Sequence, residues 1–212
     1  MANQTAGLYL QCLIGMQCND FTMIAADQTN IQGIFVLRDD ADKLHEVTNS
    51  LVMGVIGDPG DAAQFAQFVS KNTQLYKMKN GYPLDTAAVV HFTRKSLAGS
   101  LREGKPTMVN MLLAGYNETT GGELYTIDFL ASCVKVPYAV HGFGGHVCLG
   151  ILDKYYSPRL SESEGYEALK SCIQEIHQRL FVNLRNFQVK SISKSGVKVL
   201  PVINPATFIT GK

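Results

Sequence analysis

Two short apolar runs near the N-terminus constrain the fold of this chain more than any other feature. They cover residues 12–16 and 21–26, and the polar pair Asn19 and Asp20 lies between them. This pattern is typical of a β-hairpin with a tight turn. The second run is apolar at both alternating sets of positions, which predicts a strand that is covered on both faces. The run ends at Asp27, so we expect a carboxylate at the edge of a core.

Lys43 is a possible ion-pair partner of Asp27. It follows Asp27 by sixteen residues, after an acidic turn and before a segment with strand-like alternation. If adjacent strands bring the two side chains together, they can form a partly buried ion pair, and such a pair tunes the nucleophile in an N-terminal nucleophile enzyme. The alternative is an exposed lysine after an acidic turn. The spacing by itself allows both interpretations.

The remainder of the chain alternates between strand patterns and helix patterns. Strands are predicted over 34–37, 51–56, 108–116, 123–131, 132–140, 187–192 and 197–200. Helices are predicted from Asp58 to Asn80, over 85–101 and 146–155, and from Ser161 to about Leu180. The helix over 146–155 is apolar on most sides, which predicts that it is buried. The order of these elements predicts an α+β fold with two stacked antiparallel sheets between helical layers.

The expected domain organisation is one domain over residues 1–200 and a C-terminal tail over 201–212. The tail contains two prolines and four large apolar side chains, so it is either frayed or laid against a neighbouring subunit, and its apolar content favours the neighbour. The chain has 46% hydrophobic and only 17% charged residues. That composition indicates additional buried surface, as in an obligate oligomer.

Charge and cysteine usage exclude several classes of function. A net charge of +1 gives no electrostatic basis for binding nucleic acid or an anionic membrane, and no segment has the length of a membrane-spanning helix. Five cysteines without zinc-site spacing indicate reduced core residues and no metal. The glycines of segment 142–145 resemble a phosphate cradle only weakly, and a tight backbone approach explains them better. We therefore expect no cofactor.

Several longer segments, in the right order and with the right separations, resemble proteasome beta subunits. They are LIGMQCNDFTMIAADQT, DDADKLHEV, VMGVIGDPGDAAQFAQFV, NTQLYKMKNGYPL, VNMLLAGYNETTGGELYTIDFLA, PYAVHGFGG and ILDKYYSPRLS. The match runs from about Gly7 to about Val199. It implies the four-layer α/β/β/α sandwich of N-terminal nucleophile hydrolases, in a subunit that occupies the fourth beta position. The implied partners are the other beta subunits of a seven-membered ring, the opposite beta ring and the alpha ring, in cytoplasm and nucleus.

The same resemblance implies that this chain is not an enzyme. Active family members carry a threonine, freed by cleavage of a propeptide, sixteen residues before the aspartate that matches Asp27, and that position is Gln11 here. A glutamine has no hydroxyl or thiol with which to attack a peptide carbonyl. Family positions for the assisting serine and for a later aspartate and serine are Phe143, Leu180 and Asn183. Asp27 and Lys43 match the family pattern but have no nucleophile to activate.

An active peptidase with a nonstandard N-terminus is the alternative function. Processing could expose Thr5 or Cys12, because a free amino group can act as the base for its own side chain. Thr5 precedes the first predicted strand, and Cys12 lies one residue beyond the nucleophile position. Family members of this kind are used without removal of a propeptide, so we expect a chain that begins at Met1 or Ala2.

Overall fold

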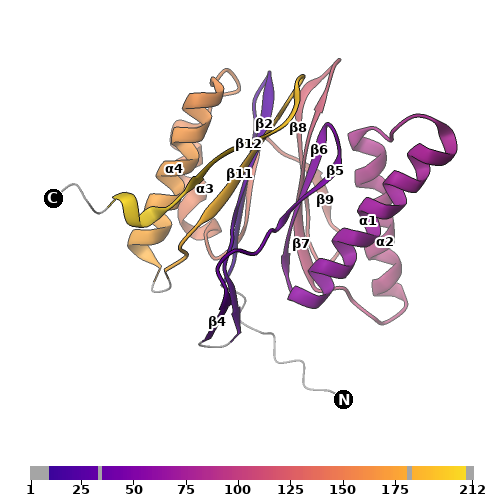
Figure 1. The fold of residues 1–212 in the computed structure, drawn as a ribbon, viewed down its shortest axis with the longest axis horizontal. Helices are drawn as coiled ribbons and strands as arrows, with labels where there is room; N and C mark the ends of the chain where they lie inside the picture. The colour runs from indigo at the N-terminus through magenta and orange to yellow at the C-terminus, as the bar shows by residue number, and fades with distance from the viewer. Residues whose placement is uncertain (1–9, 33–34, 181–182, 209–212) are drawn as a thin grey trace.

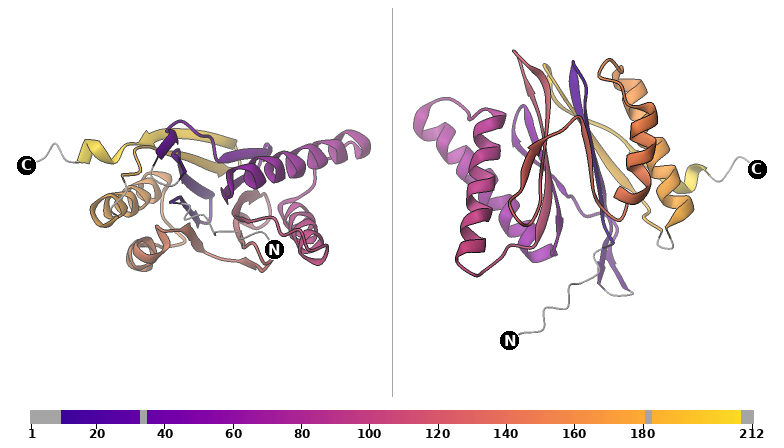
Figure 2. Two further views of the ribbon diagram at one scale, coloured as in Figure 1. Left: turned by 90° about the horizontal axis from the view of Figure 1, so that it is seen from below. Right: turned by 180° about the vertical axis from the view of Figure 1, so that it is seen from behind.

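Two stacked antiparallel sheets with helices on both outer faces form the structure (Figure 1). The computed structural model describes residues 10–32, 35–180 and 183–208. Views from two further directions show the same four layers, with α1 and α2 outside one sheet and α3 and α4 outside the other (Figure 2). The predicted α+β class and the α/β/β/α layering are therefore confirmed.

The predicted N-terminal hairpin lies at the centre of the first sheet. In spatial order this sheet contains β10 (Tyr138–Gly142), β1 (Cys12–Gln17), β2 (Phe21–Asp27), β11 (Phe187–Ser193) and β12 (Gly196–Ile203). Met16 pairs with Met23 across the hairpin, and all seven residues of β2 are buried. The prediction of a strand covered on both faces is confirmed.

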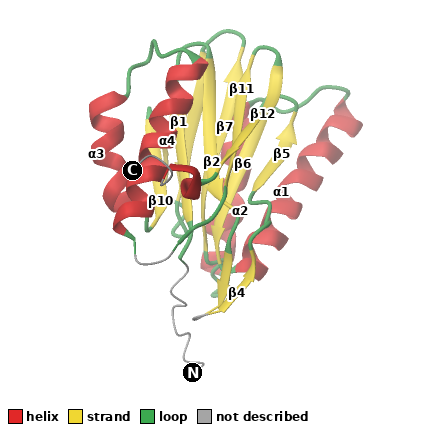
Figure 3. Ribbon diagram, turned by 60° about the vertical axis from the view of Figure 1, so that its left-hand side comes forward, coloured by secondary structure: helices red, strands yellow, loops and turns green. Residues whose placement is uncertain are grey.

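The second sheet is a meander, and a two-stranded ribbon lies outside both sheets. The meander contains β5 (Leu44–Thr48), β6 (Leu51–Gly57), β7 (Val109–Asn117), β8 (Gly121–Ile127) and β9 (Cys133–Lys135). The ribbon is made of β3 (Asn30–Gln32) and β4 (Phe35–Arg38), and it projects from one end of the sandwich (Figure 3). It includes the strand predicted over 34–37, of which residue 34 lies outside the described residues.

The segment 132–140 was expected to be one strand of the meander, and this expectation is wrong. The chain leaves the second sheet after β9 and enters the first sheet as β10, which pairs with β1. Pro137 lies between the two strands and has no N–H with which to continue a ladder. Its carbonyl instead accepts a hydrogen bond from the backbone N–H of Gln17 at 2.7 Å.

The described residues contain four α-helices, which form the outer layers and match the four predicted ranges to within about one residue at each end. They are α1 (Pro59–Asn80), α2 (Thr86–Arg102), α3 (Gly145–Tyr155) and α4 (Glu162–Arg179). Asp58 caps α1, Gly81 ends it in the left-handed conformation, and Ser161 with Glu164 forms the capping box of α4.

The prediction that α3 is buried on most sides is wrong. Only Cys148 and Leu152 of this helix are fully buried, whereas Leu149 is 42% and Tyr155 is 51% exposed. The helix belongs to an outer layer, where its inner side packs mainly on α4 and β10 while Leu149 and Tyr155 stay exposed. Apolar composition therefore misled the prediction, because it does not tell which sides of a helix face the core.

The C-terminal strand extends further than the sequence indicated. β12 continues to Ile203, three residues into the segment expected to be a tail, and Ile203 is 3% exposed. A short 3-10 helix, Pro205–Phe208, follows and contacts α4. Part of the apolar content of this segment is thus used within the subunit itself.

Candidate functional site: a buried Asp-Lys pair beside Gln11

Asp27 and Lys43 form a buried ion pair between the two sheets. Asp27 is the last residue of β2, and Lys43 immediately precedes β5 of the opposite sheet. The Lys43 Nζ lies 2.8 Å from Asp27 Oδ2, and the two side chains are 7% and 0% exposed. The predicted ion pair is confirmed, and the alternative of an exposed lysine is wrong. The pair is more deeply buried than expected, and it joins opposite sheets instead of adjacent strands.

The backbone around Asp27 supplies the rest of its hydrogen bonds. Its carboxylate accepts from the N–H of Cys12 at 2.7 Å and from the N–H of Thr29 at 3.0 Å. Lys43 also donates to the carbonyl of Thr29 at 2.8 Å. Burial raises the pKa of Asp27 above its ordinary value, while the Lys43 ammonium and the two backbone donors oppose that rise. The arrangement fixes two opposite charges in place next to the start of β1.

Gln11 precedes Cys12 in the chain, and both of its carbonyl oxygens accept hydrogen bonds. The residue is 5% exposed, and its side-chain carbonyl Oε1 accepts from the backbone N–H of Gly57 at 2.7 Å. Its backbone carbonyl accepts from the N–H of Phe143 at 3.1 Å. A carboxamide is neither a nucleophile nor a useful base, so this side chain can hold its surroundings together but cannot attack a substrate.

Of the other predicted site positions, Phe143 contacts Gln11, whereas Leu180 and Asn183 make no hydrogen bond to Gln11 or Asp27 within the described residues. Phe143 follows β10 in the turn before α3 and contacts Gln11 directly through its N–H. Leu180 ends α4 and packs against the apolar cluster that contains Cys12. Asn183 is exposed, and within the described part of the chain no hydrogen bond links its side chain to Gln11 or Asp27. The structure thus brings Gln11, Asp27, Lys43 and Phe143 together but leaves Asn183 apart.

Sequence reasoning missed two residues that complete the site. Gly57 was interpreted only as the end of a strand, yet its N–H binds the Gln11 side chain. Thr29 contributes both its N–H and its carbonyl to the ion pair. For Gly57, the available signal was a glycine between a buried strand and an Asp-Pro helix start. No side-chain pattern could have identified Thr29 from the sequence, because its backbone makes these contacts.

The residues proposed for the alternative peptidase are placed as follows. Cys12 is fully buried, and its backbone nitrogen is an internal amide that donates to Asp27. Thr5 lies outside the described residues.

Gly144 in the segment 142–145 is needed for close packing: a Cβ on Gly144 would come within 2.2 Å of the Cys12 Sγ. A tight backbone approach is therefore the reason for that glycine, as predicted.

A groove between two helices lies apart from the Asp27–Lys43 pair. A groove of about 600 Å³ lies between α1 and α2, is lined in part by Phe65, Phe68 and Phe92, and includes none of the predicted site residues. Residues 10–32, 35–180 and 183–208 contain no group of three metal-ligating side chains. Over the same ranges, none of the helices has the length and apolar character needed to cross a bilayer.

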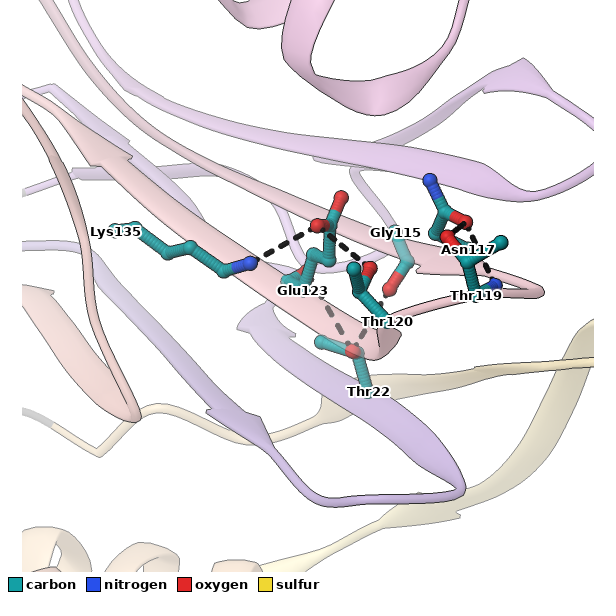
Figure 4. A network of polar contacts seen from close by, with 7 residues as sticks. All are labelled: Thr22, Gly115, Asn117, Thr119, Thr120, Glu123 and Lys135. Atoms are coloured by element: carbon teal, nitrogen blue, oxygen red, sulfur yellow. Dashed lines mark hydrogen bonds and ion pairs between the residues drawn. The ribbon is translucent and has the colours of Figure 1, made fainter.

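A second buried carboxylate belongs to a structural network at the far end of the second sheet. Glu123 in β8 is 6% exposed and accepts from Lys135 Nζ at 2.9 Å and from Thr120 Oγ1 at 3.0 Å. Nearby, Thr22 of β2 reaches across to the second sheet and donates to the carbonyl of Gly115 at 2.8 Å (Figure 4). These contacts fix the β7–β8 turn against the N-terminal hairpin.

Comparison with known proteins gives a consistent result. The family described as "Proteasome subunit" matches residues 11–192. The chain is 41% identical over 189 residues to "Proteasome subunit beta type-2" of Oryza sativa subsp. japonica, covering 89% of both chains. It is 38% identical to "Proteasome subunit beta type-2-A" of Arabidopsis thaliana, covering 89% of this chain and 92% of the relative. It is 34% identical to "Proteasome subunit beta type-4" of Saccharomyces cerevisiae, covering 89% and 96%.

The family match spans the ion pair, Gln11 and the Gly142 to Gly145 turn, and each of the three relatives aligns over 89% of this chain. The resemblance of the individual motifs, the four-layer sandwich and the relatives therefore agree. The chain belongs to the proteasome subunit family and is one of its beta subunits, which have the fold of threonine peptidases.

Proposed function

We propose that this chain is a structural, catalytically silent beta subunit of the 20S proteasome core. In this role it closes a seven-membered beta ring and shapes the chamber in which other subunits cut peptides. Its partners are the neighbouring beta subunits, the opposite beta ring and the alpha ring, and its location is the cytoplasm and nucleus. No nucleic acid, membrane, cofactor or metal has a part in this function.

The proposal rests on the presence of Gln11 at the nucleophile position of the family. It stands at the nucleophile position of the family, sixteen residues before Asp27. Its side chain offers only a carboxamide, and that group is bound to Gly57 within a nearly closed environment. Acyl transfer to a protein requires a hydroxyl, thiol or amine that can form a covalent intermediate. Gln11 supplies none of these groups.

Asp27 and Lys43 take a structural role under this proposal. In the absence of a nucleophile, their contribution is to join the two sheets and to hold the start of β1 through the N–H of Cys12. Removing one partner of a buried ion pair leaves an uncompensated charge, which is strongly destabilising. Retention of both residues is therefore consistent with selection for folding alone.

Exposed apolar side chains on the outer helix α3 and on the projecting β3–β4 ribbon support the assembly role. Leu149 and Tyr155 on α3 and Phe35 and Leu37 on β4 are between 42% and 69% exposed. Contiguous exposed apolar surface is typical of sites that other protein chains cover. A beta subunit with neighbours in its ring and in adjoining rings would bury such surfaces.

The N-terminus of the chain in the native particle tests the proposal. We would isolate the assembled core, separate its subunits and determine the intact mass and N-terminal sequence of this chain. A chain that begins at Met1 or Ala2 supports the silent role. A chain that begins at Thr5 or Cys12 would instead favour the alternative, a peptidase that uses a processed, nonstandard N-terminus.

A further inference from the structure

The N–H of Gly57 is a hydrogen-bond donor fixed in direction by its surroundings. Gly57 ends β6 with a φ of 134°, a conformation that a residue with a side chain rarely adopts. A Cβ at this position would lie 2.2 Å from the carbonyl oxygen of Met108. The next residue, Asp58, donates its own N–H to that same carbonyl at 3.0 Å. The backbone of Gly57 therefore lies close against the Met108 carbonyl, and the hydrogen bond of the next residue holds it there.

This donor is directed at the side chain that occupies the nucleophile position. The Gly57 N–H is 2.7 Å from Gln11 Oε1, and the bond is partly buried. It also lies at the N-terminal end of α1, a 22-residue helix whose dipole favours negative charge there. A backbone N–H aimed at a carbonyl oxygen beside a nucleophile position has the geometry that stabilises the oxyanion in acyl transfer.

The acceptor in this structure is an amide of the chain itself. The carboxamide of Gln11 has the same carbonyl chemistry as a peptide bond. We infer that the Gln11 side chain occupies the site in which the Gly57 N–H would otherwise bind a peptide carbonyl, so that the chain closes this site with its own amide. The inference rests on the proposed function, which it extends from a missing nucleophile to an occupied binding site.

Closure by Gln11 has a simple energetic basis. A bound peptide would have to displace a hydrogen bond that is already formed within the molecule, and it would have to move the side chain of a residue that is 5% exposed. An intramolecular acceptor needs no loss of translational freedom to bind, whereas a peptide does. The Gln11 amide therefore competes with a free peptide for the Gly57 N–H without the entropic cost that the peptide has. Substituting Gln11 should open the site.

Amide hydrogen exchange of the assembled particle tests this inference. We would compare wild type with Gln11→Ala, which vacates the site, and with Gln11→Glu, which retains an oxygen acceptor at the same reach. The exchange of Gly57 would be located within peptides that cover β6. We expect Gly57 to exchange about tenfold faster in Gln11→Ala than in wild type, and to stay protected in Gln11→Glu. Equal protection in wild type and Gln11→Ala would overturn the inference.

A second arm asks whether the vacated site accepts a peptide carbonyl. An excess of the non-reactive tripeptide amide acetyl-Leu-Leu-Leu-NH2 should restore protection of Gly57 in Gln11→Ala and leave wild type unchanged. If the peptide has no effect on Gln11→Ala, the Gly57 N–H is not a site for peptide carbonyls and the inference fails. Should Gln11→Ala not assemble, Gln11→Met replaces it in the first arm, because methionine keeps the volume and lacks the oxygen.

The two experiments can tell a failure of this inference from a failure of the proposed function. The function fails if the native chain has a processed N-terminus that carries a nucleophile, whatever the exchange of Gly57. The inference alone fails if the chain is unprocessed but Gly57 stays protected without the Gln11 oxygen.

Discussion

At the scale of single residues, the contacts of Asp27 show that the buried ion pair is held without help from the Gln11 side chain. Its carboxylate binds one ammonium and two backbone N–H groups, all at 3.0 Å or less. None of these partners depends on the residue at position 11. The chemistry of the site and its contribution to folding are therefore separable, and substitutions in the pair should affect stability first.

Lys43→Met should lower the free energy of unfolding by about 3–5 kcal/mol, because it leaves the Asp27 carboxylate buried without a counter-charge. Denaturant unfolding of the full-length chain measures the change. Combining Lys43→Met with Asp27→Asn should recover part of the loss. The exposed pair of Arg38 and Asp40 provides the control, since Arg38→Met should cause no measurable change. A similar, small effect for both lysine and arginine variants would contradict this account.

His141 should make stability depend on pH. Burial lowers the pKa of His141 below its ordinary value, although the carbonyl of Met111 and the charge of Asp128 oppose the shift. The folded chain therefore binds fewer protons than the unfolded chain as the pH falls through about 6.5. The stabilisation is present above that pH and is lost as the pH falls through the lower, folded value.

We expect the free energy of unfolding of the wild type to be smaller at pH 5.5 than at pH 7.5, and this difference to shrink in His141→Gln. Denaturant unfolding at the two pH values provides the measurement. Gln can keep a hydrogen bond to Thr126, which lies 2.8 Å from the ring Nε2 in the wild type. An unchanged difference in His141→Gln would show that the histidine is not responsible.

The limits of sequence reasoning at this scale are clear from particular residues. The spacing of Asp27 and Lys43 allowed either an ion pair or an exposed lysine, and only the family resemblance marked these two residues and Gln11 as site positions. The hydrogen-bond partner of Gln11 was not identified from the sequence. This partner is the backbone N–H of Gly57, and every residue except proline has such a group. Residues whose contribution is made by the main chain, such as Thr29, cannot be found from side-chain patterns.

At the scale of elements, the sequence was informative where a local signal sets the structure. The turn at Asn19 and Asp20, the Asp58 cap and the capping box at Ser161 depend on contacts within a few residues, and all three are present. The prediction failed for α3 and for the segment around Pro137. In both cases the outcome depends on which layer or sheet the element joins, and that is a property of the whole fold.

Ile203 shows that the end of β12 belongs to the subunit core. It pairs with Phe187 of β11 and is 3% exposed, whereas the neighbouring Val202 points outward and is 49% exposed. Ile203→Ala should lower the free energy of unfolding by about 2–4 kcal/mol. Val202→Ala should change it by less than about 0.5 kcal/mol. Equal effects in denaturant unfolding would contradict the assignment of this strand end to the core.

At the scale of the whole molecule, polar side chains connect the two sheets at several places. Lys190 of β11 is 5% exposed and donates to the carbonyl of Leu44 at 2.9 Å, Thr22 reaches Gly115, and Asp27 reaches Lys43. Each contact crosses the apolar layer between the sheets. A purely apolar layer could slip, while buried donors and acceptors are satisfied in one register only. We interpret these bridges as what fixes the relative position of the sheets.

The proposed absence of catalytic activity in this chain is tested most directly with a reactive probe. Purified native core particles would be treated with an epoxyketone that labels N-terminal threonine nucleophiles, and each subunit would then be weighed intact. We predict that other beta subunits in the same particle carry the adduct and that this chain does not. An adduct on this chain, at Thr5, Cys12 or any other residue, would contradict the claim that it is catalytically silent.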